Sequence, residues 1–98
     1  FEAEFASFCG VKHAIAVSNG TVALHLVLHT YGIGKDDEVI VTSRTFIASV
    51  SCIVNVGATP VFADVDLNTG NITSKNISKV ISKKTKAIIC VPIIIIYI

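Results

Sequence analysis

Short β-branched apolar runs alternate with apolar segments of helical length along the chain, and this alternation constrains the fold more than any other feature. The pattern predicts strands at 13–17, 38–41, 59–65 and 86–91. It predicts helices at 1–9, 21–31, 46–55 and 73–82, with a turn at 68–71. Such an order builds βαβ units, and strands that are apolar throughout fit a sheet covered on both faces. The expected fold class is therefore α/β, a mostly parallel sheet with helices on both faces.

Glycine residues mark where two of these helices should end. Gly32 directly follows the helical pattern at 21–31, and Gly57 follows the pattern at 46–55. Glycine is the residue that most often ends a helix, because it adopts the left-handed backbone conformation without a steric cost. We expect both helices to stop at these glycines.

The composition is unusually apolar for an independent domain of this size. Hydrophobic residues make up 52% of the 98 residues and charged residues only 15%, whereas about a quarter of an average domain is charged. There is no methionine, and the helical pattern at 1–9 begins without a preceding N-cap residue. We therefore expect residues 1–98 to be part of a larger domain, with both ends cut.

Charge and cysteine content bound the possible partners and compartment. The net charge is +1, and the basic residues are spread along the chain without a basic stripe, so we expect no nucleic-acid partner. No signal peptide is visible, and the apolar segment 87–98 is shorter than the roughly 20 residues of a spanning helix, so we expect no membrane association. Cys9, Cys52 and Cys90 are too scattered for a disulfide framework, which favours a reducing, cytoplasmic location.

The loop Ser18-Asn19-Gly20-Thr21 is a candidate phosphate site, because it leads into the apolar helix at 21–31. Glycine lets the backbone approach a ligand closely, and the first helical amides, those of Thr21 and Val22, have no partner within the helix. The helix dipole favours an anion there, and the Thr21 hydroxyl can donate another bond. The alternative is a serine or threonine N-cap with nothing bound. Neither a P-loop nor a dinucleotide fingerprint is present.

A second loop, 42–46, follows the strand predicted at 38–41 and ends in Phe46. Ligands of open α/β sheets bind at the carboxyl ends of strands, so the ring of Phe46 could cover a flat ligand held at Gly20 and Thr21. The alternative is a Phe46 buried in the core. Together the two loops favour a planar, phosphorylated cofactor.

Five linked strings resemble the DegT/DnrJ/EryC1/StrS aminotransferases in order and spacing, from Phe1 to about Val91. The strings are Phe1-Glu2-x-Glu4-Phe5-Ala6, Ala16-Val17-Ser18-Asn19-Gly20-Thr21-x-Ala23-Leu24, Gly32-x-Gly34-x-x-Asp37-Glu38-Val39-Ile40-Val41, Thr45-Phe46-x-Ala48-Ser49 and Val56-Gly57-Ala58-Thr59-Pro60-Val61-Phe62-x-Asp64-Val65-Asp66. Members of that family are homodimeric fold-type-I enzymes that use pyridoxal 5′-phosphate. They transfer an amino group, usually from glutamate, to a nucleotide-linked keto-sugar.

The resemblance implies that residues 1–98 are the N-terminal part of the large domain of such an enzyme, acting in surface-polysaccharide or related sugar biosynthesis. It assigns Gly20, Thr21 and the Val22 amide to the phosphate cradle. It assigns Phe46 to stacking on the pyridine ring. Glu2, Glu4 and the turn at 64–66 match the family as structural residues.

The resemblance ends in a divergent hydrophobic tail at 91–98. Beyond this point the family has the lysine that forms a Schiff base with the cofactor, an acidic residue at the pyridine nitrogen and the second half of the phosphate cradle. None of the lysines present is expected at the carboxyl ends of the strands. We therefore predict no catalytic residue in this chain and no aminotransferase activity for it alone, and whether it is an enzyme stays open.

Two other hypotheses remain. Asp64-x-Asp66 after an apolar strand also suits a glycosyltransferase that binds a metal and a sugar diphosphate. The chain could instead be a non-functional remnant of a truncated gene, with exposed apolar surface that makes it aggregate. His25 and His29 have a zinc-compatible spacing but lack a third ligand, so we predict no metal site.

Overall fold

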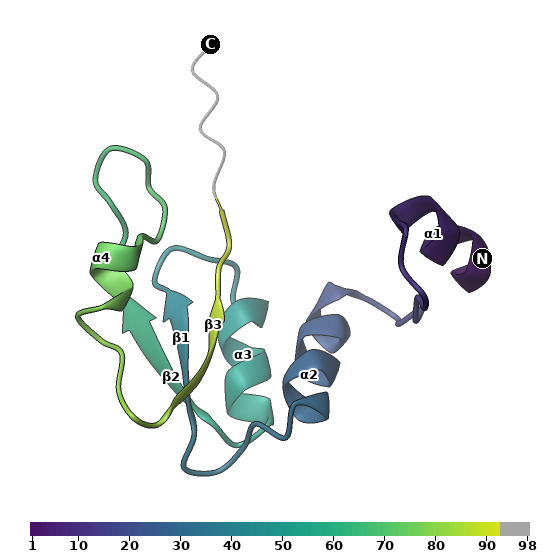
Figure 1. The fold of residues 1–98 in the computed structure, drawn as a ribbon. Coiled ribbons are helices and arrows are strands. Elements are labelled where there is room, and N and C mark those ends of the chain that lie inside the picture. Colours follow the sequence, from purple (N-terminus) through teal and green to yellow (C-terminus); the bar gives the residue numbers. More distant parts are fainter. Residues whose placement is uncertain (93–98) are drawn as a thin grey trace.

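The computed structural model describes residues 1–92 and leaves 93–98 undescribed, so most of the predicted tail at 91–98 lies outside the described residues. From residue 20 onward helices and strands alternate as the sequence predicts (Figure 1). In chain order they are α1 (Glu2–Cys9), α2 (Gly20–Thr30), β1 (Glu38–Thr42), α3 (Ala48–Asn55), β2 (Thr59–Ala63), α4 (Ser74–Ile77) and β3 (Thr85–Ile89).

The three strands form one parallel sheet in the order β2-β1-β3. β1 is the central strand and pairs with β2 in a regular register from Glu38↔Thr59 to Thr42↔Ala63. The pairing with β3 shifts by one residue after Glu38. The predicted parallel sheet is confirmed, and β3 has no strand on its outer edge within residues 1–92.

Helices lie on both faces of the sheet. Val39 and Val41 belong to the buried cluster on the side of α2 and α3. The side chain of Ile40 points to the opposite face, because side chains alternate along a strand, and it is also fully buried. The connection from β1 to β2 contains α3, and the connection from β2 back to β3 contains α4 and runs in the opposite direction along the sheet. Right-handed connections that run in opposite directions lie on opposite faces, so the segment with α4 covers Ile40.

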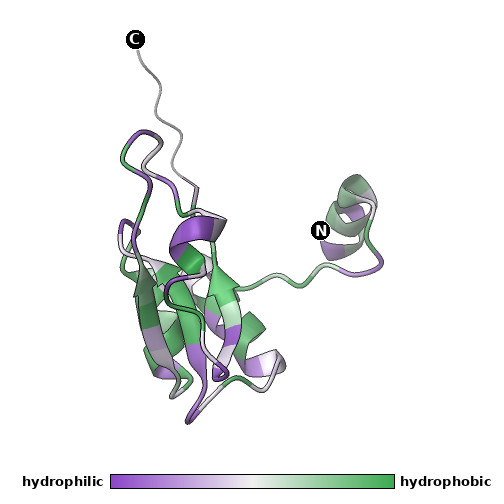
Figure 2. Ribbon diagram, turned by 60° about the vertical axis from the view of Figure 1, so that its left-hand side comes forward, coloured by the Kyte–Doolittle hydropathy of each residue, from purple (hydrophilic) through white to green (hydrophobic). Residues whose placement is uncertain are grey.

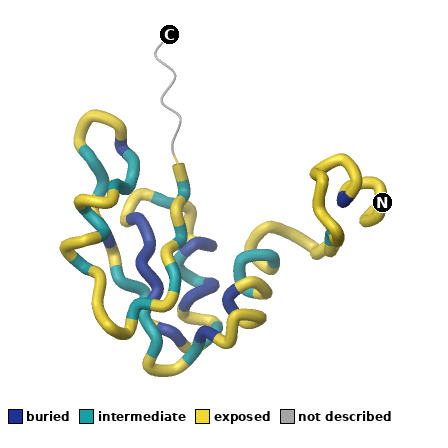
Figure 3. The backbone as a smooth tube through the Cα atoms, viewed as in Figure 1, coloured by how far each residue is buried: buried dark blue, intermediate teal, exposed yellow. Residues whose placement is uncertain are grey.

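The core lies where α2 and α3 pack against each other and α3 packs against β1 and β2. Its central side chains are apolar, and β1 is buried along nearly its whole length (Figure 3). The buried members of the cluster are Leu28, Ile33, Val39, Val41, Cys52, Ile53 and Ala58. Burial raises the pKa of the Cys52 thiol, so this cysteine acts as a small apolar side chain.

Gly32 ends α2 as predicted. Its φ is 68°, in the left-handed region that favours glycine. The Gly32 N–H donates to the His29 carbonyl at 3.0 Å, and the Ile33 N–H donates to the Leu28 carbonyl at 3.1 Å. Ile33 and Leu28 also meet in the core, as expected for this type of helix end.

The strand predicted at 13–17 is wrong. This segment is extended but pairs with no strand, and it connects α2 to α1, which lies apart from the sheet (Figures 1 and 2). A strand requires a neighbour for its backbone groups, and none of the described strands is next to it. Ile15 and Val17 instead lie along the flank of α2. Glu2 fixes the segment to α1 by accepting a 2.7 Å hydrogen bond from the Ala16 N–H.

Other predicted boundaries need smaller corrections. The helix predicted at 73–82 is one turn, α4, because Thr73 caps its start but the following residues form only turns. α3 begins at Ala48, two positions after the predicted start. β2 ends at Ala63, and Val65, inside the predicted strand, instead forms an isolated antiparallel bridge with Ile72.

The exposed edge of β3 predicts self-association of the chain when it is made alone. Ile88, the next-to-last residue of β3, is 42% exposed, and an apolar strand edge pairs readily with another copy. We expect Ile88→Lys to shift the chain toward monomer in sedimentation velocity. Asn68→Lys, which adds the same charge in an exposed turn, is the control. A parent chain that stays monomeric at high concentration would contradict this expectation.

Candidate functional site

The first turn of α2 is held by Asn19, which the sequence interpretation missed as the N-cap. Its side-chain Oδ1 accepts a 3.0 Å hydrogen bond from the Val22 N–H. Its carbonyl accepts from the Ala23 N–H at 3.1 Å, the first backbone bond of the helix. Asparagine is among the strongest N-cap residues, so the signal was present in the sequence. The alternative of a serine or threonine cap is wrong in its residue, because Asn19 occupies that position.

The three predicted cradle amides therefore differ. The N–H groups of Gly20 and Thr21 precede the first intrahelical bond and lie at the exposed start of α2. The expectation that the Val22 amide is free is wrong, because this N–H already donates to Asn19. Its role in a phosphate cradle stays a prediction. A Cβ at Gly20 would meet no atom within 4 Å, so the space beside this residue is open.

The loop from β1 to α3 presents Phe46 to solvent. Its start is fixed by two bonds: the Ser43 N–H donates to the Ala63 carbonyl at 3.3 Å, and the Arg44 N–H donates to the Thr42 hydroxyl at 3.4 Å. Phe46 is 73% exposed. The alternative of a core Phe46 is therefore wrong, and its ring is available to a ligand.

Gly20, Thr21 and Phe46 come together around one hollow of about 600 Å³. The hollow lies between the first turns of α2 and α3, and apolar side chains of α2 form most of its floor. Its lining comprises Gly20, Thr21, Ala23, Leu24, Val27, Phe46, Ala48 and Ser49. Val22 is not part of this lining. Ser49, which the sequence interpretation did not single out as a site residue, is buried and lines the same hollow as Phe46.

The hollow suits a flat anion electrostatically. The N-terminal ends of both α2 and α3 line it, and each helix N-terminus has a partial positive charge. Among the residues that the structure describes, no carboxylate side chain belongs to its lining. A phosphate can therefore bind at Gly20 and Thr21 while an aromatic ring lies against Phe46.

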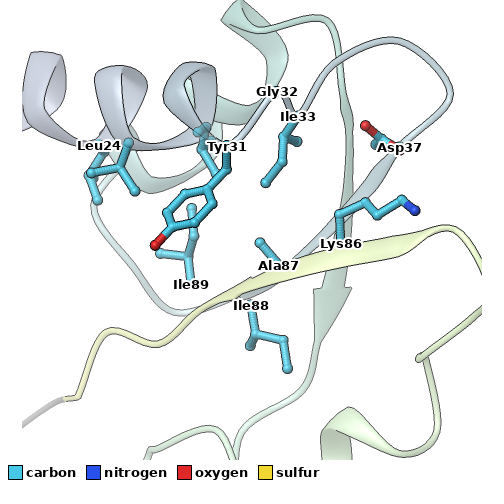
Figure 4. Close-up of a pocket in the computed structure, with 11 residues that line it drawn as sticks. Leu24, Tyr31, Gly32, Ile33, Asp37, Lys86, Ala87, Ile88 and Ile89 are labelled. Carbon is cyan, nitrogen blue, oxygen red and sulfur yellow. The ribbon is translucent and has the colours of Figure 1, made fainter.

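A larger hollow of about 710 Å³ lies between α2 and β3 and differs in chemistry (Figure 4). Leu24 and Tyr31 extend from α2 toward Ala87 and Ile89, while Ile88 points to the other side of β3. Its polar residues, Asp37 and Lys86, lie at one end, and Asp37 accepts a bond from the Gly34 N–H at 3.1 Å. This hollow lacks the amides of a helix start, so it is a poor phosphate site.

The Asp64-x-Asp66 pair forms a turn. The Asp66 carboxylate accepts hydrogen bonds from the Asn68 N–H at 3.1 Å, the Thr69 N–H at 3.0 Å and the Thr69 hydroxyl at 3.1 Å. The bonds from Thr69 hold the pKa of this carboxyl below its usual range. Asp64 accepts from the Val65 N–H at 2.8 Å. Both carboxylates thus organise the local backbone, and the glycosyltransferase hypothesis has no support from this geometry.

His25 and His29 stack on one side of α2, with ring centroids 6.3 Å apart. Nowhere in residues 1–92 do three or more His, Cys, Asp or Glu side chains gather so that they could hold a metal. The pair therefore has no third ligand in the described part of the chain.

Comparison with known families identifies the family and the fold. A sequence profile described as the DegT/DnrJ/EryC1/StrS aminotransferase family matches residues 1–94. The chain belongs to this family. The resemblance drawn from the motifs is confirmed, and the match extends slightly past Val91.

Individual family members agree in sequence and structure. GDP-perosamine synthase of Vibrio cholerae is 50% identical over 93 residues, which are 95% of this chain and 25% of that protein. The solved aminotransferase from Psychrobacter cryohalolentis is 58% identical with a TM-score of 0.84, over 91% of this chain and 22% of the other. Spr1654 of Streptococcus pneumoniae, solved in a PLP form, is 34% identical with a TM-score of 0.84, over 89% and 22%. The chain spans about a quarter of the length of these relatives and matches part of their large domain.

Within residues 1–92, none of the helices has the length and apolar character that crossing a membrane requires.

The Asn19 cap gives a direct test of how the first turn of α2 is held. We expect Asn19→Ala to destabilise this turn by about 1 kcal/mol, because the Val22 N–H loses its acceptor. Amide hydrogen exchange in the first turn of α2 should then be about fivefold faster. Asn19→Asp keeps an acceptor and should exchange like the parent. Equal exchange in the alanine and aspartate variants would show that the cap is not needed.

The turn at Asp66 should depend on pH. Its folded-state pKa is depressed, so the stabilisation exists above the ordinary pKa of 3.8 and is lost as the pH falls through the folded-state value. We expect the Thr69 amide resonance to move with that titration below pH 3.8 and to stay constant above it. In Asp66→Asn the resonance should no longer titrate. Manganese should leave it unchanged at neutral pH, and a specific manganese shift would revive the glycosyltransferase hypothesis.

Proposed function

We propose that this chain supplies one side of the pyridoxal 5′-phosphate site of a nucleotide-sugar aminotransferase. The observation that carries the proposal is the single hollow that joins the amide-rich start of α2, at Gly20 and Thr21, to the exposed ring of Phe46. Family membership and the PLP form of Spr1654 support this choice of cofactor.

The residues present fit the cofactor's phosphate. Gly20 leaves open space beside its backbone, and the N–H groups of Gly20 and Thr21 precede the first intrahelical bond. The Thr21 hydroxyl adds a donor on the same turn. The Val22 amide can join only if a phosphate oxygen shares or replaces its present bond to Asn19. In this role Asn19 keeps the turn ordered until the phosphate binds.

Phe46 fits the cofactor's ring. An exposed phenyl group at the rim offers a flat apolar surface, and stacking of this kind contributes about 0.5–1.5 kcal/mol beyond the area that it buries. Once bound, pyridoxal phosphate supplies an electron sink for carbanion chemistry. The part of Phe46 is to hold the ring in one plane and to exclude water from one of its faces.

The substrate and assembly follow from the family and are part of the same proposal. The amino acceptor would be a nucleotide-linked keto-sugar, in line with the GDP-perosamine synthase of Vibrio cholerae. The donor would be glutamate, and the complete enzyme would be a homodimer in the cytoplasm that serves surface-polysaccharide or related sugar biosynthesis.

Catalysis would need residues that this chain does not bring to the hollow. No lysine lines it within the described part of the protein, so no amine there could form a Schiff base with the cofactor. Residues 1–98 would bind and orient the cofactor. Groups from the rest of a polypeptide as long as the named relatives would complete the reaction. Alone, the chain should have no aminotransferase activity.

Ligand binding tests the proposal without requiring turnover. The probe is pyridoxamine 5′-phosphate, which has no aldehyde and so cannot react with surface lysines. We expect Phe46→Ala to weaken this ligand about fivefold and to leave inorganic phosphate unchanged, because only stacking is lost. Gly20→Val should weaken both ligands, because its side chain fills the space beside the cradle. Both affinities can be measured by calorimetry.

The control variant is Leu67→Ala, at an exposed position in the turn at 67–69. It should bind both ligands like the parent chain. Failure of the parent chain to bind pyridoxamine 5′-phosphate at millimolar concentration, or equal binding by all variants, would refute the site.

A further inference from the structure

The loop that presents Phe46 is fastened at its far end by a pair of hydroxyl groups. The Thr45 hydroxyl donates a 2.9 Å hydrogen bond to the Ser49 hydroxyl. Ser49 is only 4% exposed and lines the same hollow as Phe46. A buried hydroxyl that is both partnered and at the rim of a ligand site restricts the residues around it.

Ser49 holds the residues on both sides of the Thr45–Phe46 peptide bond. Its side chain accepts from Thr45, and its backbone N–H donates to the Phe46 carbonyl at 3.0 Å. Two bonds from one buried residue thus define the direction in which the chain enters α3. The ring of Phe46 leaves the backbone between these two points.

Within residues 1–92, no side chain caps the backbone amides of this helix start. The N-cap position of α3 is Ile47, which makes no side-chain capping bond, and an apolar residue there is unusual because it leaves the first amides without an acceptor. The Thr45–Ser49 pair is therefore the side-chain hydrogen bond that ties the loop to the first turn, whereas the Ser51 hydroxyl bonds within the helix, to the Ala48 carbonyl at 3.4 Å. Thr42 and Ser43 fix only the beginning of the loop, at the end of β1.

We propose that Thr45 and Ser49 are positioning residues that hold the Phe46 ring over the hollow. They act through the backbone of Phe46 and need no contact with the ligand. A ring held in place before binding loses less conformational entropy when a ligand stacks on it. The pair therefore increases affinity for a planar phosphorylated ligand without changing affinity for phosphate alone. The ligand part of this inference rests on the proposed function.

Matched substitutions at Thr45 separate positioning from general stability. Thr45 is half-buried; Thr45→Val keeps its shape and removes the hydroxyl, whereas Thr45→Ser keeps the hydroxyl. In the 98-residue chain we expect Thr45→Val to weaken pyridoxamine 5′-phosphate about fivefold and inorganic phosphate not at all. Thr45→Ser should behave like the parent. In a Phe46→Ala background, Thr45→Val should cause no further loss.

Hydrogen exchange of the Ser49 amide gives a readout that needs no ligand. This N–H is bound to the Phe46 carbonyl, so it should exchange several-fold faster in Thr45→Val than in Thr45→Ser. Equal exchange in the two variants would overturn the inference, whether or not the parent binds pyridoxamine 5′-phosphate. If the parent does not bind it but exchange differs as expected, only the proposed function fails. A Thr45→Val variant that loses both ligands equally, or that retains full affinity for pyridoxamine 5′-phosphate, would also overturn it.

Discussion

The packing of α2 against α3 is the contact on which the site depends. α3 packs on β1 and β2, α2 packs against α3, and Leu24 of α2 and Val50 of α3 pack against the same buried cluster. Because their N-terminal ends lie on one side of the sheet, Gly20 and Ala48 border the same hollow. A shift of one helix along the other would separate the amides of α2 from Phe46, so the core sets the geometry of the proposed cofactor site.

Polar contacts refine what the core positions. Asn19 orders the first turn of α2, and Ser49 orders the first turn of α3. Each uses one short side chain to satisfy backbone or hydroxyl groups that would otherwise need water. Small polar residues therefore order the two helix starts of a hollow that is otherwise lined mostly by apolar side chains, Phe46 among them.

The high share of apolar residues appears in the structure as apolar side chains and a strand edge that no other part of the described chain covers. Phe1 and Phe8 on α1 are 83% and 87% exposed, and β3 lacks an outer neighbour within the described residues. Relatives about four times longer have additional chain to cover such surfaces. The same features that favour self-association of this chain alone would become internal packing in a protein of that length.

The sequence by itself determined the parallel α/β order, the end of α2 at Gly32, the family, and Gly20, Thr21 and Phe46 as candidates. These features follow from local patterns and spacing, that is, from residues that are close together in the sequence. It failed at 13–17, whose apolar pattern resembles a strand but whose backbone finds no partner. The bond from the Val22 N–H to Asn19 is also local, so its signal was present in the sequence although it was missed. Only the tertiary structure placed Phe46 and Gly20 around one hollow and brought Ser49 into its lining. Each of these depends on how α2 and α3 pack, because contacts between separate elements are not encoded in the spacing of either one.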